Sequence, residues 1–83
     1  MTEFSKIYDV FFDSITDDMY MEITKEETEK MVFSLFTNAL PWFEFPRFNI
    51  YAYDLDLDGY EYNMTMEEIK IIATYMIVEW LGQ

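Results

Sequence analysis

The residues with the clearest chemical potential are the alternating acids of Asp54-Leu55-Asp56-Leu57-Asp58-Gly59. An EF-hand calcium loop opens with D-x-D-x-D-G, so the acids and the glycine stand where such a loop needs them. The rest of the loop pattern is missing, because position twelve, which requires a bidentate acid, is Thr65, and position eight, usually apolar, is Glu61. Leu55 and Leu57 would also lie exposed on the loop. A β-hairpin accounts for all of these residues, so we predict no metal site.

The same acids also suggest a general acid–base pair drawn from Asp54, Asp56 and Glu61. Catalytic carboxylates depend on a concave, partly apolar setting, whereas the pattern here indicates a solvated strand face. The chain has no Cys and no His, which excludes thiol nucleophiles and the commonest general base and metal ligand. It also has no Gly-rich phosphate loop. We therefore predict that the protein is not an enzyme and takes no cofactor.

The strands that would carry these acids are predicted from Asp58-Gly59, a dipeptide typical of a two-residue turn with positive φ at both positions. A hairpin over about 49-64, centred on this turn, aligns three pairs of apolar residues. The pairs are Leu57 with Tyr60, Leu55 with Tyr62, and Tyr53 with Met64. All six side chains then share one face, and the acids and Asn63 share the other.

Three helices are predicted around the hairpin, over about 3-16, 25-40 and 66-81. In the first, apolar residues recur every three or four positions from Phe4 to Ile15, which is typical of an amphipathic helix. Thr2 is its expected N-cap. The expected fold class is α+β and mainly helical, in a single domain over 1-83.

The ends of the other two helices have local signals. Each begins with a capping box, Thr24 with Glu27 for the second helix and Thr65 with Glu68 for the last. Pro41 ends the second helix, and an irregular or single-turn segment follows it. Gly82 is the expected stop of the last helix.

The chain contains more apolar material than one small core is expected to hide. Of its 83 residues, 52% are hydrophobic and 20% aromatic, which excludes an acidic disordered chain. Domains of this size are marginal and usually gain stability from a disulfide, a metal or a partner. The segment Ile69 to Leu81 is apolar around nearly its whole circumference, which indicates neighbours on several sides. We expect subunit contacts in a homo-oligomer; the alternative is a monomer with an aromatic-rich core.

Aromatic residues supply the candidate interface. The run Trp42-Phe43-Glu44-Phe45-Pro46-Arg47-Phe48 places four aromatic residues among seven, and aromatic and arginine side chains dominate interaction hot spots. The same run is equally consistent with packing as core. The candidate interface residues are Trp42, Phe43, Phe45, Phe48, Tyr75, Met76 and Trp80.

The net charge of −12, from 17 acidic and 5 basic residues, limits the choice of partners. Direct sequence-specific binding to nucleic acid needs many more basic groups. A surface that imitates DNA remains an alternative, in which the protein inhibits a host DNA-binding enzyme. No membrane partner is expected, because the opening residues do not form a signal peptide and the apolar stretch is shorter than the roughly 20 residues of a spanning helix.

The last third of the chain carries a resemblance to a known group of proteins. The segment MTMEEIKIIATYMIVEWL, residues 64–81, resembles the motif (L/M)T-x-E-E-I-x-I-(I/L)-A-x-x-M-x-V-E-W-L of small structural proteins of tailed bacteriophages. The opening stretch from Ile7 to Asp17 is similar to that group's Y-x-x-F-L-x-K-I-T-D. The middle of the chain, Pro41 to Phe48 and the hairpin, departs from the group's pattern.

The resemblance implies a neck or head–tail connector (adaptor) subunit. Such a subunit forms a homo-oligomeric ring with the portal and other neck or tail proteins and has no enzymatic activity. It would be made in the host bacterial cytoplasm and would end in the virion. Because the middle of the chain departs from the pattern, a tail or baseplate position stays open.

Overall fold

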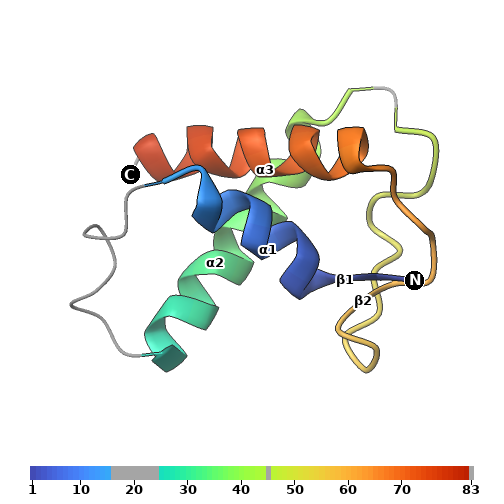
Figure 1. Cartoon of the computed structure of the whole chain (residues 1–83), viewed down its shortest axis with the longest axis horizontal. Coiled ribbons are helices and arrows are strands. Elements are labelled where there is room, and N and C mark those ends of the chain that lie inside the picture. Colours follow the sequence, from blue (N-terminus) through green and yellow to red (C-terminus); the bar gives the residue numbers. More distant parts are fainter. Residues whose placement is uncertain (16–24, 45, 83) are drawn as a thin grey trace.

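Three helices and a two-stranded antiparallel sheet make up the part of the chain that this computed structural model describes, residues 1–15, 25–44 and 46–82 (Figure 1). In chain order the elements are β1 (Thr2–Glu3), α1 (Phe4–Asp13), α2 (Lys25–Ala39), the single 3₁₀ turn η2 (Leu40–Trp42), β2 (Gly59–Tyr60) and α3 (Met66–Leu81). The predicted class, mainly helical with a small β component before the last helix, is confirmed.

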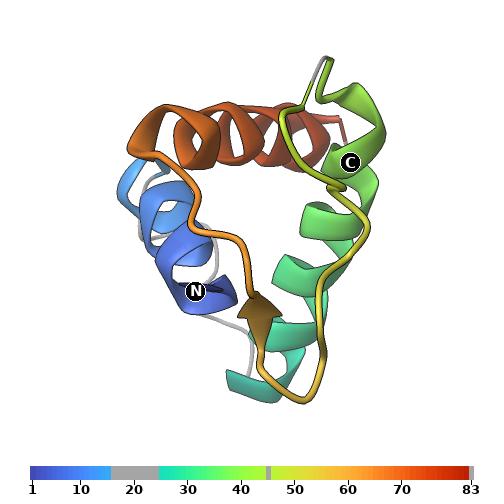
Figure 2. The same ribbon diagram turned by 90° about the vertical axis from the view of Figure 1, so that its right-hand side faces the viewer.

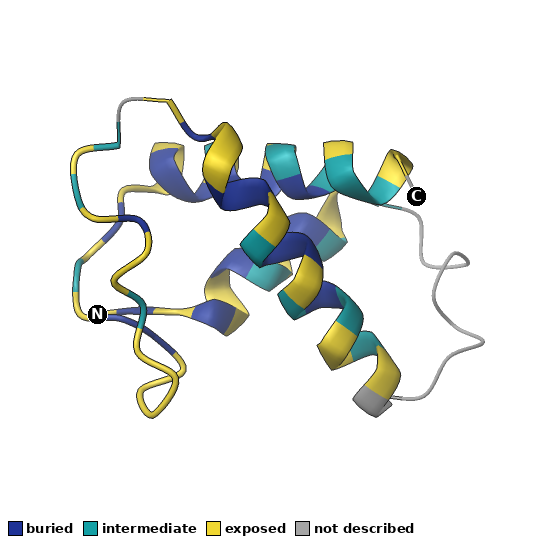
Figure 3. Cartoon of the chain, turned by 180° about the vertical axis from the view of Figure 1, so that it is seen from behind, coloured by how far each residue is buried: buried dark blue, intermediate teal, exposed yellow. Residues whose placement is uncertain are grey.

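Helix α3 lies across both other helices, and the long segment between η2 and β2 closes the remaining side (Figures 1 and 2). The buried side chains that the elements enclose form one cluster, in which apolar residues of all three helices meet Ile50 of the segment before β2, Tyr60 of β2 and Met64 after it. Figure 3 shows buried residues alternating with exposed ones along each helix.

The start of α1 differs from the prediction at Thr2. Glu3 is the N-cap of α1 and makes no side-chain capping bond, so the predicted cap at Thr2 is wrong. Thr2 lies in β1 instead, 3% exposed. Its Oγ1 donates to the carbonyl oxygen of Tyr62 at 2.8 Å and accepts from the backbone N–H of Met64 at 2.8 Å. The hydroxyl therefore links the N-terminus to the segment that leads into α3.

Helix α1 ends at Asp13, about three residues before the predicted end, whereas the C-terminal end of α2 and both ends of α3 follow their local signals. At the start of α3, Thr65 Oγ1 accepts from the Glu68 N–H at 3.1 Å, and Glu68 accepts from the Thr65 N–H at 2.9 Å, which confirms the predicted capping box. Gly82 is the C-cap of α3. Helix α2 ends at Ala39, directly before the predicted single turn. The capping box predicted at Thr24 lies outside the described residues.

The predicted hairpin register is wrong. Asp54 and Gly59 form the bridge that closes the turn, with backbone N···O distances of 2.7 and 3.2 Å. The turn therefore spans residues 55–58 rather than Asp58-Gly59, and only Asp58 has a positive φ, 54°. Beyond the bridge, β2 pairs with β1, Thr2 opposite Tyr60 and Glu3 opposite Gly59. Leu55 and Leu57, expected on the buried face, are 62% and 38% exposed.

Replacing Thr2 with valine is expected to lower the free energy of unfolding by about 1–3 kcal/mol. Valine keeps the shape of the side chain but removes both hydrogen bonds, and the Met64 N–H is then buried without a partner. Urea unfolding followed by circular dichroism measures the loss. Thr74→Val is the matched control, because the Thr74 hydroxyl donates to the Lys70 carbonyl on an exposed helix face. Equal losses in the two variants would contradict the structural role of Thr2.

Candidate functional site

The side of α3 that faces away from α1 and α2 exposes several large apolar side chains. One side of the helix is buried through Ile69, Ile72, Ala73 and Met76. The opposite side carries the exposed Met66, Val78 and Leu81, flanked by Ile71 and Tyr75, which are half-buried against the core cluster; we call these five residues the outer face of α3. Met66, Val78 and Leu81 are 49%, 52% and 72% exposed, so the helix is apolar both toward the core and toward solvent.

Polar residues are interspersed along this outer face. Lys70, Thr74 and Glu67 lie among its apolar residues and, with Met66, Ile71 and Tyr75, line a shallow hollow of about 520 Å³. From Met66 to Leu81 the face runs for about 22 Å, at about 1.5 Å of rise per residue. A hydrophobic face of this length without a partner is typical of a protein–protein contact.

Trp42 adds an exposed aromatic ring beside α3. Its side chain is 54% exposed, and its Nε1–H donates to Glu79 Oε1 at 2.8 Å. This bond fixes the end of η2 against the last turns of α3. Of the two alternatives that the sequence left open for this run, core or surface, Trp42 lies at the surface.

The other predicted interface residues divide between core and surface. Met76 is fully buried and Phe43 is 9% exposed, so within one chain both belong to the core rather than to a surface. Trp80 is half-buried, with its ring 6.3 Å from that of Phe11 in an edge-on contact. Tyr75 is half-buried on the outer face of α3. Phe45 lies outside the described residues.

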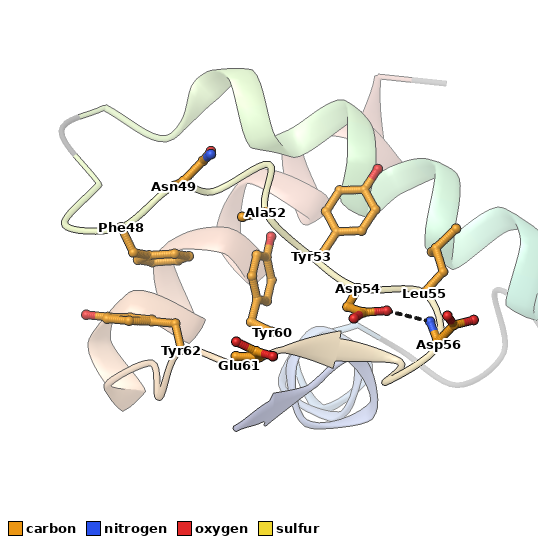
Figure 4. A pocket seen from close by; sticks show the side chains of 10 residues that line it. All are labelled: Phe48, Asn49, Ala52, Tyr53, Asp54, Leu55, Asp56, Tyr60, Glu61 and Tyr62. Atoms are coloured by element: carbon orange, nitrogen blue, oxygen red, sulfur yellow. Dashed lines mark hydrogen bonds between the residues drawn. The ribbon is translucent and has the colours of Figure 1, made fainter.

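Phe48, the remaining candidate, lines an open groove of about 650 Å³ between the segment after η2 and the segment around β2 (Figure 4). Its ring stacks on Tyr62 at one end of the groove, with 4.2 Å between centroids and 14° between planes. Tyr60 lies in the middle and Tyr53 toward the other end (Figure 4). We call this the aromatic groove.

Two tyrosine hydroxyls of the aromatic groove are held by hydrogen bonds. The Tyr60 hydroxyl donates to the Ile50 carbonyl oxygen at 2.6 Å, and burial, with a smaller contribution from Tyr53, raises its pKa. Burial and the Glu68 carboxylate raise the pKa of the Tyr62 hydroxyl, and Arg47 partly opposes them. Both rings therefore stay neutral and fixed near pH 7.

The acids considered for chemistry lie at the edge of this groove. Asp54, Asp56 and Glu61 line it and are exposed. Asp54 Oδ1 accepts from the Asp56 backbone N–H at 2.8 Å, so the Asp54 carboxylate stabilises the turn. Within the described residues, no group of three or more His, Cys, Asp or Glu side chains is placed to hold a metal ion.

The sequence pointed to the acids and to Phe48 but not to their joint surface. The groove forms because the chain folds back at residues 55–58 and then pairs with β1, which brings Tyr60 and Tyr62 opposite Phe48 and Tyr53. The alternation of side chains along the predicted hairpin strands placed Tyr53 and Tyr62 on one face of the hairpin. This alternation was the sequence signal that came closest to predicting the groove.

No helix in the described part of the chain has the length and apolar content needed to cross a membrane. Comparison with known proteins identifies no relative of this chain. No family model matches it, and neither the curated proteins nor the solved structures contain a significant match.

Proposed function

We propose that this chain is a structural protein of a tailed-bacteriophage virion, a neck or head–tail connector subunit that assembles as a ring with portal and tail proteins. The observation that carries the assembly proposal is the exposed apolar outer face of α3. The similarity of residues 64–81 to the phage motif supports the finer assignment. In this proposal the protein is made in the host cytoplasm, acts in the virion and has no catalytic role.

The energetics of the outer face favour a partner. A large apolar side chain that passes from water to a fully buried site contributes about 1.5–3 kcal/mol. Met66, Val78 and Leu81 are 49%, 52% and 72% exposed, and the exposed Trp42 ring lies beside the last turns of α3. Burial of these side chains in a contact contributes several kcal/mol of favourable free energy, which offsets part of the entropic cost of association.

A second copy of the chain is the simplest partner for this face. Glu67 and Lys70 lie on it within one helical turn, so each copy presents both a carboxylate and an ammonium group. A neighbouring copy therefore offers an opposite charge to each of them, around an apolar centre. A self-complementary contact of this kind closes as a two-fold dimer, and a ring needs in addition a contact between two different surfaces of the chain.

Light scattering across a concentration series tests self-assembly directly. We expect the solution mass to rise above the 10.1 kDa of one chain toward a fixed multiple. The double variant Met66→Lys/Val78→Lys is expected to remain at the monomer mass, because two ammonium groups would enter the apolar centre. These lysines also reduce the net negative charge, so general repulsion between chains does not explain a loss of assembly.

The control for these lysines is the variant Tyr51→Lys/Leu55→Lys. Tyr51 and Leu55 are 59% and 62% exposed and lie outside α3, so the control should assemble like the unaltered protein. Loss of assembly in both double variants, or in neither, would contradict the outer face of α3 as the contact. A strict monomer that fails to bind an isolated portal ring and instead binds a basic DNA-binding enzyme would favour the DNA-mimic alternative.

A further inference from the structure

We propose that the aromatic groove is a binding site for a cationic side chain, such as arginine, presented by a basic segment of a partner protein. This site is separate from the outer face of α3, and it does not depend on whether the chain forms a ring. The groove combines aromatic walls, an acidic edge and an open shape.

The walls of the groove supply aromatic rings at both ends. Phe48 and Tyr62 form a stacked pair at one end, and the Tyr53 ring stands 6.1 Å from Tyr60 in an edge-on contact toward the other. Phe48 also meets Tyr60 edge-on at 5.5 Å. The rings therefore hold one another in fixed orientations before a ligand arrives. The face of an aromatic ring attracts a cation, and the rings with accessible surface here are those of the half-buried Phe48, Tyr53 and Tyr62, because Tyr60 is only 1% exposed.

The edge of the groove supplies negative charge. Asp54, Asp56 and Glu61 all line it, and no basic side chain is among the ten described residues of the lining. None of these three acids forms an ion pair with another residue that the structure describes. Figure 4 shows their carboxylates beside Tyr60 and Leu55, at the open side of the groove.

Carboxylates beside aromatic rings favour a positively charged group at the end of a flexible side chain. A ligand that carries both a positive charge and an apolar or planar surface makes use of the carboxylates and the rings together, as a guanidinium group does. The volume of about 650 Å³ falls within the range of about 300–1,000 Å³ typical of small-ligand sites, so an arginine side chain fits. The net charge of −12 draws a basic segment toward the molecule.

The probe for this site is a blocked peptide, Gly-Gly-Arg-Gly-Arg-Gly-Gly, titrated into the full chain and followed by ¹H–¹⁵N NMR. The same peptide with citrulline in place of arginine keeps the shape and removes the charge. We expect the arginine peptide to shift the amide signals of residues 48–62 in a saturable way, and the citrulline peptide to leave them in place.

Two double variants of equal charge separate the groove from general electrostatic attraction. Asp56→Asn/Glu61→Gln removes two acids of the groove, and Asp9→Asn/Asp13→Asn removes two exposed acids of α1. We expect the first variant to bind the arginine peptide about fivefold more weakly and the second to bind it nearly as well as the unaltered chain. The altered side chains of both variants are exposed, so both are expected to fold.

Three results would overturn the proposal. Equal weakening in the two variants would show nonspecific attraction, and equal binding of the citrulline peptide would show that charge is not recognised. Groove signals that move with protein concentration and not with peptide would show that a second copy of the chain fills the groove.

Discussion

Replacing Gly59 with alanine is expected to lower the free energy of unfolding by about 3–4 kcal/mol. A Cβ atom at this position would stand 2.2 Å from the Thr2 carbonyl oxygen and 2.8 Å from Glu3 Cα. Both atoms belong to the backbone of β1, which cannot rotate away as a side chain can, so the two strands must separate. For a domain of this size the whole free energy of unfolding is about 4–12 kcal/mol, so the loss is a large share of it.

Separation of the strands would also break contacts around Gly59. The Phe4 N–H donates to the Asp58 carbonyl oxygen at 2.7 Å, and the Thr2 hydroxyl holds Tyr62 and Met64. These bonds depend on the same close approach of β1 to β2. Urea unfolding followed by tryptophan fluorescence measures the total effect, and the first residues of α1 should lose protection from hydrogen exchange before the rest.

The second glycine of the chain is the matched control. A Cβ at Gly82 would stand 3.4 Å from the Val78 carbonyl oxygen and 3.7 Å from that of Glu79, which are ordinary contacts. Its φ of −85° suits any residue. Gly82→Ala should therefore be neutral or stabilising by up to about 1 kcal/mol, because alanine favours a helix end in this conformation. If Gly59→Ala were as mild, the close contact of β1 with β2 would be wrong.

Helix signals were local, and this is why the helices could be predicted. Thr65 and Glu68 lie three residues apart and cap each other, so their sequence spacing already contains the geometry. The pairing of β2 with β1, in contrast, depends on residues that lie far apart in the sequence. Thr2 and Tyr60 are neighbours in the sheet and distant in the chain, and a strand of two residues has no period for a pattern to detect.

The dipeptide Asp58-Gly59 shows how one sequence signal can have two structural causes. The dipeptide suggested a two-residue turn with positive φ at both positions. In the structure only Asp58 adopts positive φ, and Gly59 is required because β1 passes too close for a side chain. Glycine satisfies either demand, so the sequence alone could not distinguish them.

The candidate interface was predicted in part for a related reason. Tyr75 and Met76 were both selected from α3, but only Tyr75 lies on the outer face, while Met76 is fully buried. A helix that is apolar on all sides has no polar stripe from which to decide which side faces the core. That decision comes from α1 and α2, which pack against α3 from one side.

The aromatic core leads to the second large effect, the substitution of Phe36 by alanine. Phe36 has no exposed surface, and its ring lies 5.1 Å from Phe4, 5.8 Å from Tyr53 and 6.3 Å from Tyr60. These neighbours belong to α1 and to the segment around β2, so one ring of α2 joins three parts of the chain. Its removal leaves a cavity between elements that the backbone alone cannot close.

We expect Phe36→Ala to lower the free energy of unfolding by about 3–5 kcal/mol, with the loss of aromatic pairs included. Thermal unfolding followed by circular dichroism should show a much lower midpoint, or no cooperative transition at 37 °C. Phe36→Leu restores most of the volume and should recover more than half of the loss. This recovery distinguishes a packing defect from a general sensitivity of α2 to substitution.

Phe33→Ala is the control within the same helix. Phe33 is half-buried and lies 5.9 Å from Phe4 and 6.1 Å from Tyr53, so it shares neighbours with Phe36 but keeps contact with solvent. The change in helix propensity is identical for the two variants, and any difference between them reports burial. We expect Phe33→Ala to cost about half as much as Phe36→Ala. A cost at Phe33 equal to or greater than that at Phe36 would mean that the aromatic cluster is centred elsewhere, and that α2 meets α1 with a different face.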